Sequence, residues 1–124
     1  MYRVLIVDDE PYFSEGLKNL IKWEEFGLEV YSVAYDGEEA LKIIENVRIH
    51  VLITDIKMPK MHGIQLIDYI RSKKLDIRCI VLSGYDDFKY VKAAAVLGIE
   101  NYFLKPINEE ELSVYQFIRT QRGL

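Results

Sequence analysis

The stretch Val4-Leu5-Ile6-Val7-Asp8-Asp9 places two carboxylates directly after four consecutive apolar residues. A continuous apolar run of this kind is typical of a strand that is buried on both faces of a parallel sheet. The same arrangement recurs at residues 51–54, which Asp55 follows. Carboxylates are costly inside such a sheet, but they can lie just beyond the end of a strand. The stretch therefore predicts an α/β protein whose acidic side chains gather at one edge of its sheet.

Five strand-like segments alternate with helical ones along the chain. They are residues 4–7, 30–34, 51–54, 80–82 and 102–104. Strands that alternate with helices of about 10 to 15 residues imply right-handed crossovers and a parallel sheet. We predict a three-layer α/β sandwich with a five-stranded parallel sheet in the order 2-1-3-4-5. Asp8, Asp9 and Asp55 then follow the two strands at the topological switch point, where such sheets bind ligands.

The helical segments carry recognisable end signals and apolar stripes. Asp36 and Glu39 form a capping-box pattern at the start of the second helix, and Gly98 is placed to end the fourth in the left-handed conformation. Trp23 and Phe26 are interpreted as a hydrophobic plug at the end of the first helix. The residues expected to form the apolar stripes are Phe13, Leu17, Leu20, Ile21, Ala40, Leu41, Ile44, Leu66, Ile67, Ile70, Phe88, Val91, Ala95, Leu112, Tyr115 and Ile118.

Length and composition limit the function classes. The 124 residues suit one domain, and the 16 basic against 20 acidic residues argue against a nucleic-acid surface. Cys79 is the single cysteine, which excludes an internal disulfide and a thiolate zinc site. No apolar run approaches the roughly 20 residues that span a bilayer, and the N-terminus enters a strand without a signal-peptide pattern. We therefore expect a cytoplasmic protein that does not associate with membranes.

The polar residues after the strands suit one chemistry. An all-oxygen ligand set favours Mg²⁺ or Mn²⁺, with Asp9 and Asp55 as direct ligands and Asp8 acting through a water. Lys105, after the fifth strand, supplies a positive charge for a phosphate, and Ser83, after the fourth, supplies a hydroxyl. Each residue alone would suit a turn, a helix cap or a solvent-exposed position. Together they point to covalent phosphoryl transfer to an aspartate.

Four segments carry a resemblance to a known family. They are VLIVDDEP at 4–11, DIKMP at 55–59 with Gly63, SGY at 83–85, and Lys105-Pro106. Through them the chain resembles, over nearly its full length, the receiver domain of two-component response regulators, which has a flavodoxin-like fold. The resemblance implies a signalling switch that takes a phosphoryl group from a sensor histidine kinase. It implies no enzymatic activity beyond the chain's own phosphorylation and dephosphorylation.

The resemblance also assigns roles to residues. It makes Asp55 the phosphoacceptor and gives Mg²⁺ a site formed by Asp8, Asp9, Asp55 and the backbone carbonyl of Lys57. It makes Ser83 the switch hydroxyl, in a position where Thr is commoner, and Tyr102 the switch aromatic. It places Lys105 against the phosphoryl group and makes the bond before Pro106 cis.

A finer resemblance concerns the output of the switch. The stretches WEEFG at 23–27 and SGYDDF at 83–88 are similar to regulators with an AraC-type helix-turn-helix output domain. No helix-turn-helix is found in these residues, so we expect a receiver domain at 1–119 and a tail at 120–124 that begins a linker to an absent output domain. A homodimer formed on phosphorylation is also expected. The alternative is a stand-alone receiver that acts through protein contacts.

Other classes fit the residues less well. A haloacid-dehalogenase-like phosphatase needs a second aspartate two residues after its nucleophile, where this chain has Lys57, and the chain lacks a cap domain. A flavodoxin-like binding module needs a phosphate-cradling loop after the first strand, where Asp9 and Glu10 would repel an anion. A metal-independent pseudo-receiver conflicts with the intact acid set. His50 and His62 are interpreted as surface histidines, and residues 93–95 either pack on the sheet or form a docking surface.

Overall fold

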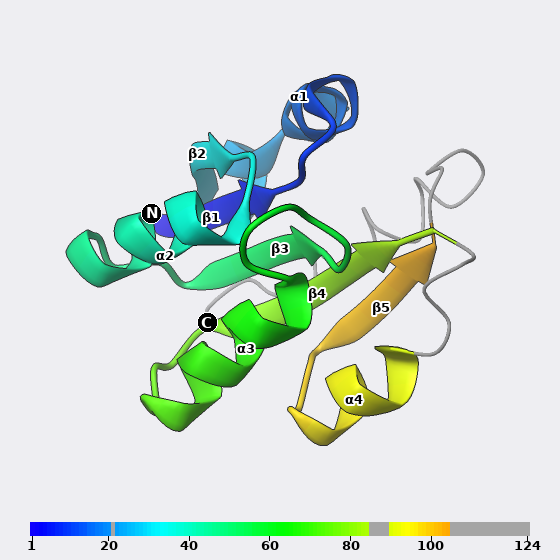
Figure 1. The fold of residues 1–124 in the computed structure, drawn as a ribbon. Coiled ribbons are helices and arrows are strands. Elements are labelled where there is room, and N and C mark those ends of the chain that lie inside the picture. The colour runs from blue at the N-terminus through cyan, green and yellow to red at the C-terminus, as the bar shows by residue number, and fades with distance from the viewer. Residues whose placement is uncertain (21, 85–89, 105–124) are drawn as a thin grey trace.

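The computed structural model describes residues 1–20, 22–84 and 90–104 (Figure 1). Its five strands form a parallel sheet in the order β2-β1-β3-β4-β5, as the sequence predicts. In chain order the elements are β1 (Tyr2–Val7), α1 (Pro11–Leu20), the short 3-10 helix η1 (Trp23–Phe26), β2 (Leu28–Ala34), α2 (Gly37–Asn46), β3 (Val51–Asp55), α3 (Gly63–Ser72), β4 (Arg78–Ser83), α4 (Val91–Val96) and β5 (Asn101–Leu104). Within the described ranges, no helix is long and apolar enough to cross a membrane.

Alternating side chains of the strands build two separate cores. Leu5 and Val7 of β1 face the core that α2, α3 and α4 cover, and these three helices lie on the same face of the sheet in Figure 1. Val4 and Ile6 face the other core, which Leu17 of α1 joins. The alternation follows from the strand geometry, in which successive side chains point to opposite faces. The layers on both faces of the sheet confirm the predicted α/β sandwich.

The helix and turn signals act largely as the sequence predicts. Asp36 caps α2, where its Oδ1 accepts a hydrogen bond of 2.8 Å from the backbone N–H of Glu39. The Glu39 carboxylate accepts in return from the backbone N–H of Tyr35, at 3.4 Å, which extends the capping pattern by one residue. Gly98 follows α4 with φ of +71°. The left-handed conformation that was expected of this glycine is therefore present.

Trp23 and Phe26 form the plug that was expected after the first helix. Their side chains are only 4% and 7% exposed, and both belong to the α1-side core. The indole Nε1 of Trp23 donates a hydrogen bond of 2.9 Å to the backbone oxygen of Lys18. This bond satisfies a carbonyl in the last turn of α1, so the plug also caps the helix.

Two apolar positions differ from the prediction. Leu20 is 39% exposed, because α1 ends at this residue and the buried position beyond it is taken by Trp23. Ala95 is exposed, whereas Ala94 is fully buried, because the helical rotation of the short α4 brings position 94 against the core. The alanines at 93 and 95 are both exposed, so only one residue of this run packs on the sheet. Ile21, Phe88, the fifth helix and the side chain of Val91 lie outside what the structure describes.

Arg71 holds together three segments that are distant in sequence. It extends from the last turn of α3 and donates hydrogen bonds to three backbone oxygens. The acceptors are Leu97 at 2.8 Å and Gly98 at 2.9 Å, both at the end of α4, and Ile77 at 2.8 Å, just before β4. The bonds to Leu97 and Gly98 satisfy carbonyl groups that the end of α4 leaves without an intrahelical partner. The position of α4 is therefore tied to the end of α3.

Candidate functional site

The carboxyl ends of β1 and β3 bring together a cluster of four acidic residues. The cluster contains Asp8, Asp9, Glu10 and Asp55, and one carboxylate oxygen of each lies within 4.8 Å of the others. The residues that precede the aspartates, Val7 and Thr54, are partners in the parallel ladder. Asp8 and Asp55 are buried, at 1% and 6% exposure, whereas Asp9 and Glu10 are exposed. The three aspartates that were expected to converge do so, and they form a half-buried site.

Glu10 was not among the predicted ligands, and the local turn explains its place in the cluster. Its backbone N–H donates to Oδ1 of Asp8 at 2.8 Å, which folds the chain back directly after β1. α1 then begins at Pro11, and the backbone N–H of Phe13 donates to the backbone oxygen of Glu10 at 3.1 Å. An aspartate that precedes a helix by three residues is a turn signal that predicts such a bond.

Asp55 lies at the last position of β3, where its orientation is fixed from two sides. Its Oδ1 accepts a hydrogen bond of 2.7 Å from the backbone N–H of Ile56. Its backbone oxygen accepts one of 2.9 Å from the hydroxyl of Thr54. On the other side, a Cβ added at Gly63 would lie 2.1 Å from this same backbone oxygen. The first residue of α3 therefore packs directly on Asp55, which leaves room only for glycine.

The loop between β3 and α3 is fastened to the start of α2. Lys60, which has a positive φ of 67°, places its Nζ 3.6 Å from Oδ2 of Asp36. A Cβ at Gly37 would lie 2.3 Å from the backbone oxygen of Met61. The Glu39 hydrogen bond and, after it, the Lys60 charge lower the pKa of the Asp36 carboxyl, while burial opposes them. Asp36 therefore serves as a helix cap and as an anchor for the loop beside the acidic cluster.

His62 has a structural role that differs from the surface position expected of it. The half-buried imidazole is the N-cap of α3, and its Nδ1 accepts from the backbone N–H of Ile64 at 3.2 Å. The side chain of Gln65 accepts in return from the His62 N–H at 2.8 Å. The ring also lies 4.7 Å from the ring of Tyr90, at the start of α4. The contact joins the end of the loop beside Asp55 to the α4 region.

The other predicted site residues are placed only in part. Ser83 ends β4, one residue beyond Leu82, which pairs with Asp55, so its backbone lies at the same edge of the sheet. Tyr102 is half-buried in β5, where it pairs with Val81 of β4. It packs against the core that α2, α3 and α4 cover. Lys57, two residues after Asp55, is exposed. Two predicted site residues, Lys105 and Pro106, lie outside the described ranges, as does Tyr85 of the SGY motif.

The chemistry of the cluster suits a hard divalent cation. Every ligand atom it offers is a carboxylate oxygen, and Mg²⁺ prefers oxygen ligands, commonly one or two carboxylates completed by waters. Four carboxylates at this separation also repel one another, so a cation stabilises the ionised cluster. The donor set therefore fits Mg²⁺ or Mn²⁺, as the sequence predicts.

Comparison with known proteins defines the class. The model of the response regulator receiver domain family matches residues 4–115. The chain therefore belongs to this family, and it is the receiver domain of a two-component response regulator. This assignment decides against the phosphatase and flavodoxin-like alternatives.

The chain is similar to several curated regulators. It is 41% identical over 124 residues to an uncharacterized response regulatory protein of Staphylococcus epidermidis, covering all of this chain and 49% of the relative. It is 40% identical to the transcriptional regulatory protein HptR of Staphylococcus aureus, over 92% of this chain and 44% of the relative. The uncharacterized transcriptional regulatory protein YesN of Bacillus subtilis is 38% identical over 90% of this chain and 30% of its own length. The chain thus spans half or less of these relatives.

Solved structures agree with the family assignment. The REC domain of AraT, a response regulator from Geobacillus stearothermophilus, superposes with a TM-score of 0.88 at 39% identity, covering 97% of this chain and 94% of that chain. A two-component transcriptional regulator AraC from Clostridium phytofermentans superposes with a TM-score of 0.83 at 36% identity, covering 97% and 92%. Both solved chains have the same fold, and little of either solved chain lies outside the shared region.

Proposed function

We propose that this receiver domain accepts a phosphoryl group on Asp55 from a sensor histidine kinase and thereby controls a transcriptional output domain. The observation that carries the proposal is the convergence of three acidic residues around a buried, oriented aspartate. Asp55 is the acceptor because it is the member of the cluster that ends β3 and has one carboxylate oxygen held by the Ile56 N–H.

The transfer forms an oxygen–phosphorus bond and breaks a nitrogen–phosphorus bond. A carboxylate oxygen of Asp55 attacks the phosphorus of the kinase's phosphohistidine, and the electron pair of the broken bond returns to the imidazole nitrogen. Asp9, Asp55 and the Lys57 carbonyl would hold Mg²⁺, with Asp8 acting through a water, and the bound cation would supply charge that offsets the repulsion between carboxylate and phosphoryl oxygens. Lys105, the residue that follows β5 in the sequence, is proposed to supply positive charge for the same purpose.

The phosphoryl oxygens then change the contacts of two neighbouring residues. The Ser83 hydroxyl donates to the new oxygens, and Tyr102 turns toward the space that this movement opens. Phosphate shifts such a two-state element only through the contacts that differ between its states. Support comes from Tyr102 itself, which is half-buried on β5 and packs against the core that α2, α3 and α4 cover.

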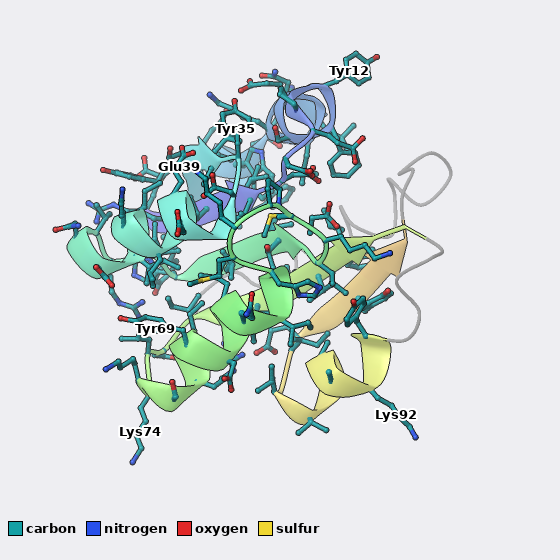
Figure 2. The ribbon with its side chains drawn as sticks, in the orientation of Figure 1. Tyr12, Tyr35, Glu39, Tyr69, Lys74 and Lys92 are labelled. Atoms are coloured by element: carbon teal, nitrogen blue, oxygen red, sulfur yellow. The ribbon has the colours of Figure 1, made fainter. Side chains whose placement is uncertain are left out.

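Two surfaces serve the partners in this proposal. The kinase docks on the acidic edge and α1, where Tyr12 is 97% exposed and points into solvent (Figure 2). The α4–β5 side contacts the output domain or a second copy of the chain. Support there comes from Val96, which is 86% exposed on α4. Both partners place the protein in the cytoplasm.

The output domain is proposed to be an AraC-type helix-turn-helix that follows residues 1–119 through the tail at 120–124. Support comes from relatives that carry transcriptional names and are at least twice as long as the match. The alternative is a stand-alone receiver that acts through protein contacts. The rest of the coding sequence distinguishes the two.

Intact-mass spectrometry after incubation with acetyl phosphate and Mg²⁺ tests the acceptor. We expect one phosphoryl adduct in the wild type, none in Asp55→Asn, and a normal adduct in Asp68→Asn, whose carboxylate is exposed on α3. Chelating the cation is expected to prevent the adduct in every protein. An adduct that persists in Asp55→Asn would rule out Asp55 as the acceptor.

Ser83→Ala is expected to keep the adduct but to lose most of the NMR shift changes in α4.

A further inference from the structure

The amino end of the sheet carries two adjoining hollows, at the opposite edge from the acidic cluster. The first has a volume of about 250 Å³ and a polar lining formed by Tyr2, Arg48, His50, Asp76 and Arg78. The second has a volume of about 220 Å³ and a mostly aliphatic lining formed by Ile44, Val47, Arg48, Ile49, Lys74, Leu75, Asp76 and Ile77. Arg48 and Asp76 line both hollows, so the contact between them forms the shared wall.

The guanidinium in this wall is held in place by the backbone. Nη1 of Arg48 donates a hydrogen bond to the backbone oxygen of Ile49. Nη2 lies 3.9 Å from Oδ2 of Asp76, whose side chain is 99% exposed. An exposed ion pair at this distance contributes only about 0–1 kcal/mol. The Asp76 carboxylate is therefore easily replaced at Arg48 by another carboxylate.

His50 adds a neutral hydrogen-bond donor to the polar hollow. Its Nδ1 accepts from the backbone N–H of Arg3 at 3.0 Å, so in the neutral ring the proton is on Nε2. Burial, and then the charges of Arg48 and Arg3, lower the pKa of His50. Of these causes, the positive charges of Arg48 and Arg3 also favour an anion beside the ring.

We propose that the two hollows form one binding site for a small aliphatic carboxylate. The carboxylate group binds Arg48 in place of Asp76, in the polar hollow that Arg78 and His50 also line. The aliphatic part fills the neighbouring hollow against Ile44, Val47 and Leu75. Planar bidentate pairing with a carboxylate is the geometry that a fixed guanidinium favours. The site is independent of the phosphorylation proposed at Asp55.

The two linings decide between ligand classes. Inorganic phosphate would satisfy the arginines but would leave the aliphatic hollow empty. A fully apolar molecule would make no use of the guanidinium of Arg48 in the polar hollow. Each volume, about 250 and 220 Å³, is smaller than the roughly 300 Å³ at which the usual range of ligand pockets begins, which points to a small molecule.

An NMR titration with isovalerate at constant ionic strength tests the site. We expect saturable shifts of the amides that border both hollows, with acetate at least about tenfold weaker because it buries fewer methylene groups. Phosphate is expected to bind at least about tenfold more weakly, for the same reason, and isobutylamine to leave these amides unshifted. Equal affinity for isovalerate, acetate and phosphate would show that the aliphatic hollow takes no part, and absence of saturation would overturn the site altogether.

Two variants are expected to change the affinity for isovalerate in opposite directions. Asp76→Asn removes the competing carboxylate and is expected to tighten isovalerate binding by about fivefold, since a salt-bridge competitor of about 1 kcal/mol is lost. Arg48→Gln is expected to abolish saturation. Lys92→Gln is the control, because Lys92 projects from α4, well away from Lys74 beside the aliphatic hollow (Figure 2). Arg48 and Asp76 are both exposed, so both variants should fold. Unchanged binding in either of them would overturn the proposal.

Discussion

The two edges of the sheet differ in charge and in packing. The carboxyl edge gathers four acidic side chains, and α3 starts so close to Asp55 that a methyl group at Gly63 would lie 2.1 Å from its backbone oxygen. The amino edge gathers Arg48, His50 and Arg78, together with the carboxylate of Asp76, around open hollows. In a parallel sheet, residues before the strands meet at one edge and residues after them meet at the other. A chain can therefore build two sites of opposite charge by sorting residues on either side of each strand.

The largest expected effect tests the tight packing of the carboxyl edge. Gly63→Ala should lower the free energy of unfolding by about 3 kcal/mol, because the added methyl group overlaps the Asp55 backbone. Gly16→Ala is the matched control, since Gly16 lies in α1 with no atom within 4 Å of an added Cβ. It should stabilise by about 0.5–1 kcal/mol. Urea denaturation measures both, and a Gly63→Ala protein as stable as wild type would show that α3 can shift freely from Asp55.

Mg²⁺ tests the charge of the same edge. At about a hundred times its dissociation constant, the cation should raise the wild-type free energy of unfolding by about 2.7 kcal/mol. Asp9→Asn should lose most of this gain, and without the cation it should be more stable than wild type by about 1 kcal/mol, because one like charge is removed. Asp9 is exposed, so the variant leaves the Asp8–Glu10 turn intact. Thermal unfolding with Mg²⁺ and with a chelator measures the difference; equal gains in both proteins would contradict the metal site.

Two arginines near the amino edge have different uses. Arg71→Gln should cost about 2 kcal/mol of stability, because it removes three hydrogen bonds to backbone carbonyls. Arg48→Gln should change stability by less than about 1 kcal/mol, because the half-exposed Arg48 side chain contributes only an exposed ion pair and one hydrogen bond to the neighbouring residue's carbonyl. Arg71→Lys, which keeps the charge without the planar fork, should recover little. Similar costs for the Arg71 and Arg48 variants in urea would remove this distinction.

The smallest effect is a pH dependence from the amino edge. The pKa of His50 is lowered below its ordinary value of 6.5, so the unfolded chain takes up this proton more readily than the folded one. The stability contribution is complete above pH 6.5 and declines as the pH falls below it. His50→Gln keeps an acceptor for the Arg3 N–H and should flatten this part of the profile. If the two proteins lose stability in parallel on acidification, His50 does not contribute.

The sequence predicted the sheet and its acidic edge because both depend on apolar runs. Buried strands of a parallel sheet need such runs, and Asp8 and Asp55 follow two of them directly. The strand order follows from right-handed crossovers, and the structure has that order. Polar strand beginnings were harder to recognise. β1, β2 and β4 each start two residues earlier than predicted, at Tyr2, Leu28 and Arg78. The backbone is already paired with the neighbouring strand at these positions. The prediction missed them because exposed or half-buried residues interrupt the apolar pattern at the start of each strand.

The features that the sequence did not reveal depend on contacts between distant residues. Glu10 joins the acidic cluster through a turn, and Arg71 reaches carbonyls more than twenty positions away in sequence. No periodicity encodes such contacts, because a long polar side chain on a helix has the same pattern whether it reaches solvent or a backbone. His62 was misjudged for a related reason, since its capping role depends on the ring's orientation and on Tyr90.

The single cysteine gives the molecule a practical property. Cys79 is fully buried in β4, and burial raises the pKa of its thiol to about 11. Since the thiolate is the reactive form, this thiol should resist alkylation in the folded protein near neutral pH. A cysteine introduced by Val96→Cys, at a position that is 86% exposed, would then be the one side chain that a maleimide dye modifies. Fluorescence from α4 could therefore follow its response in real time without removing the native cysteine.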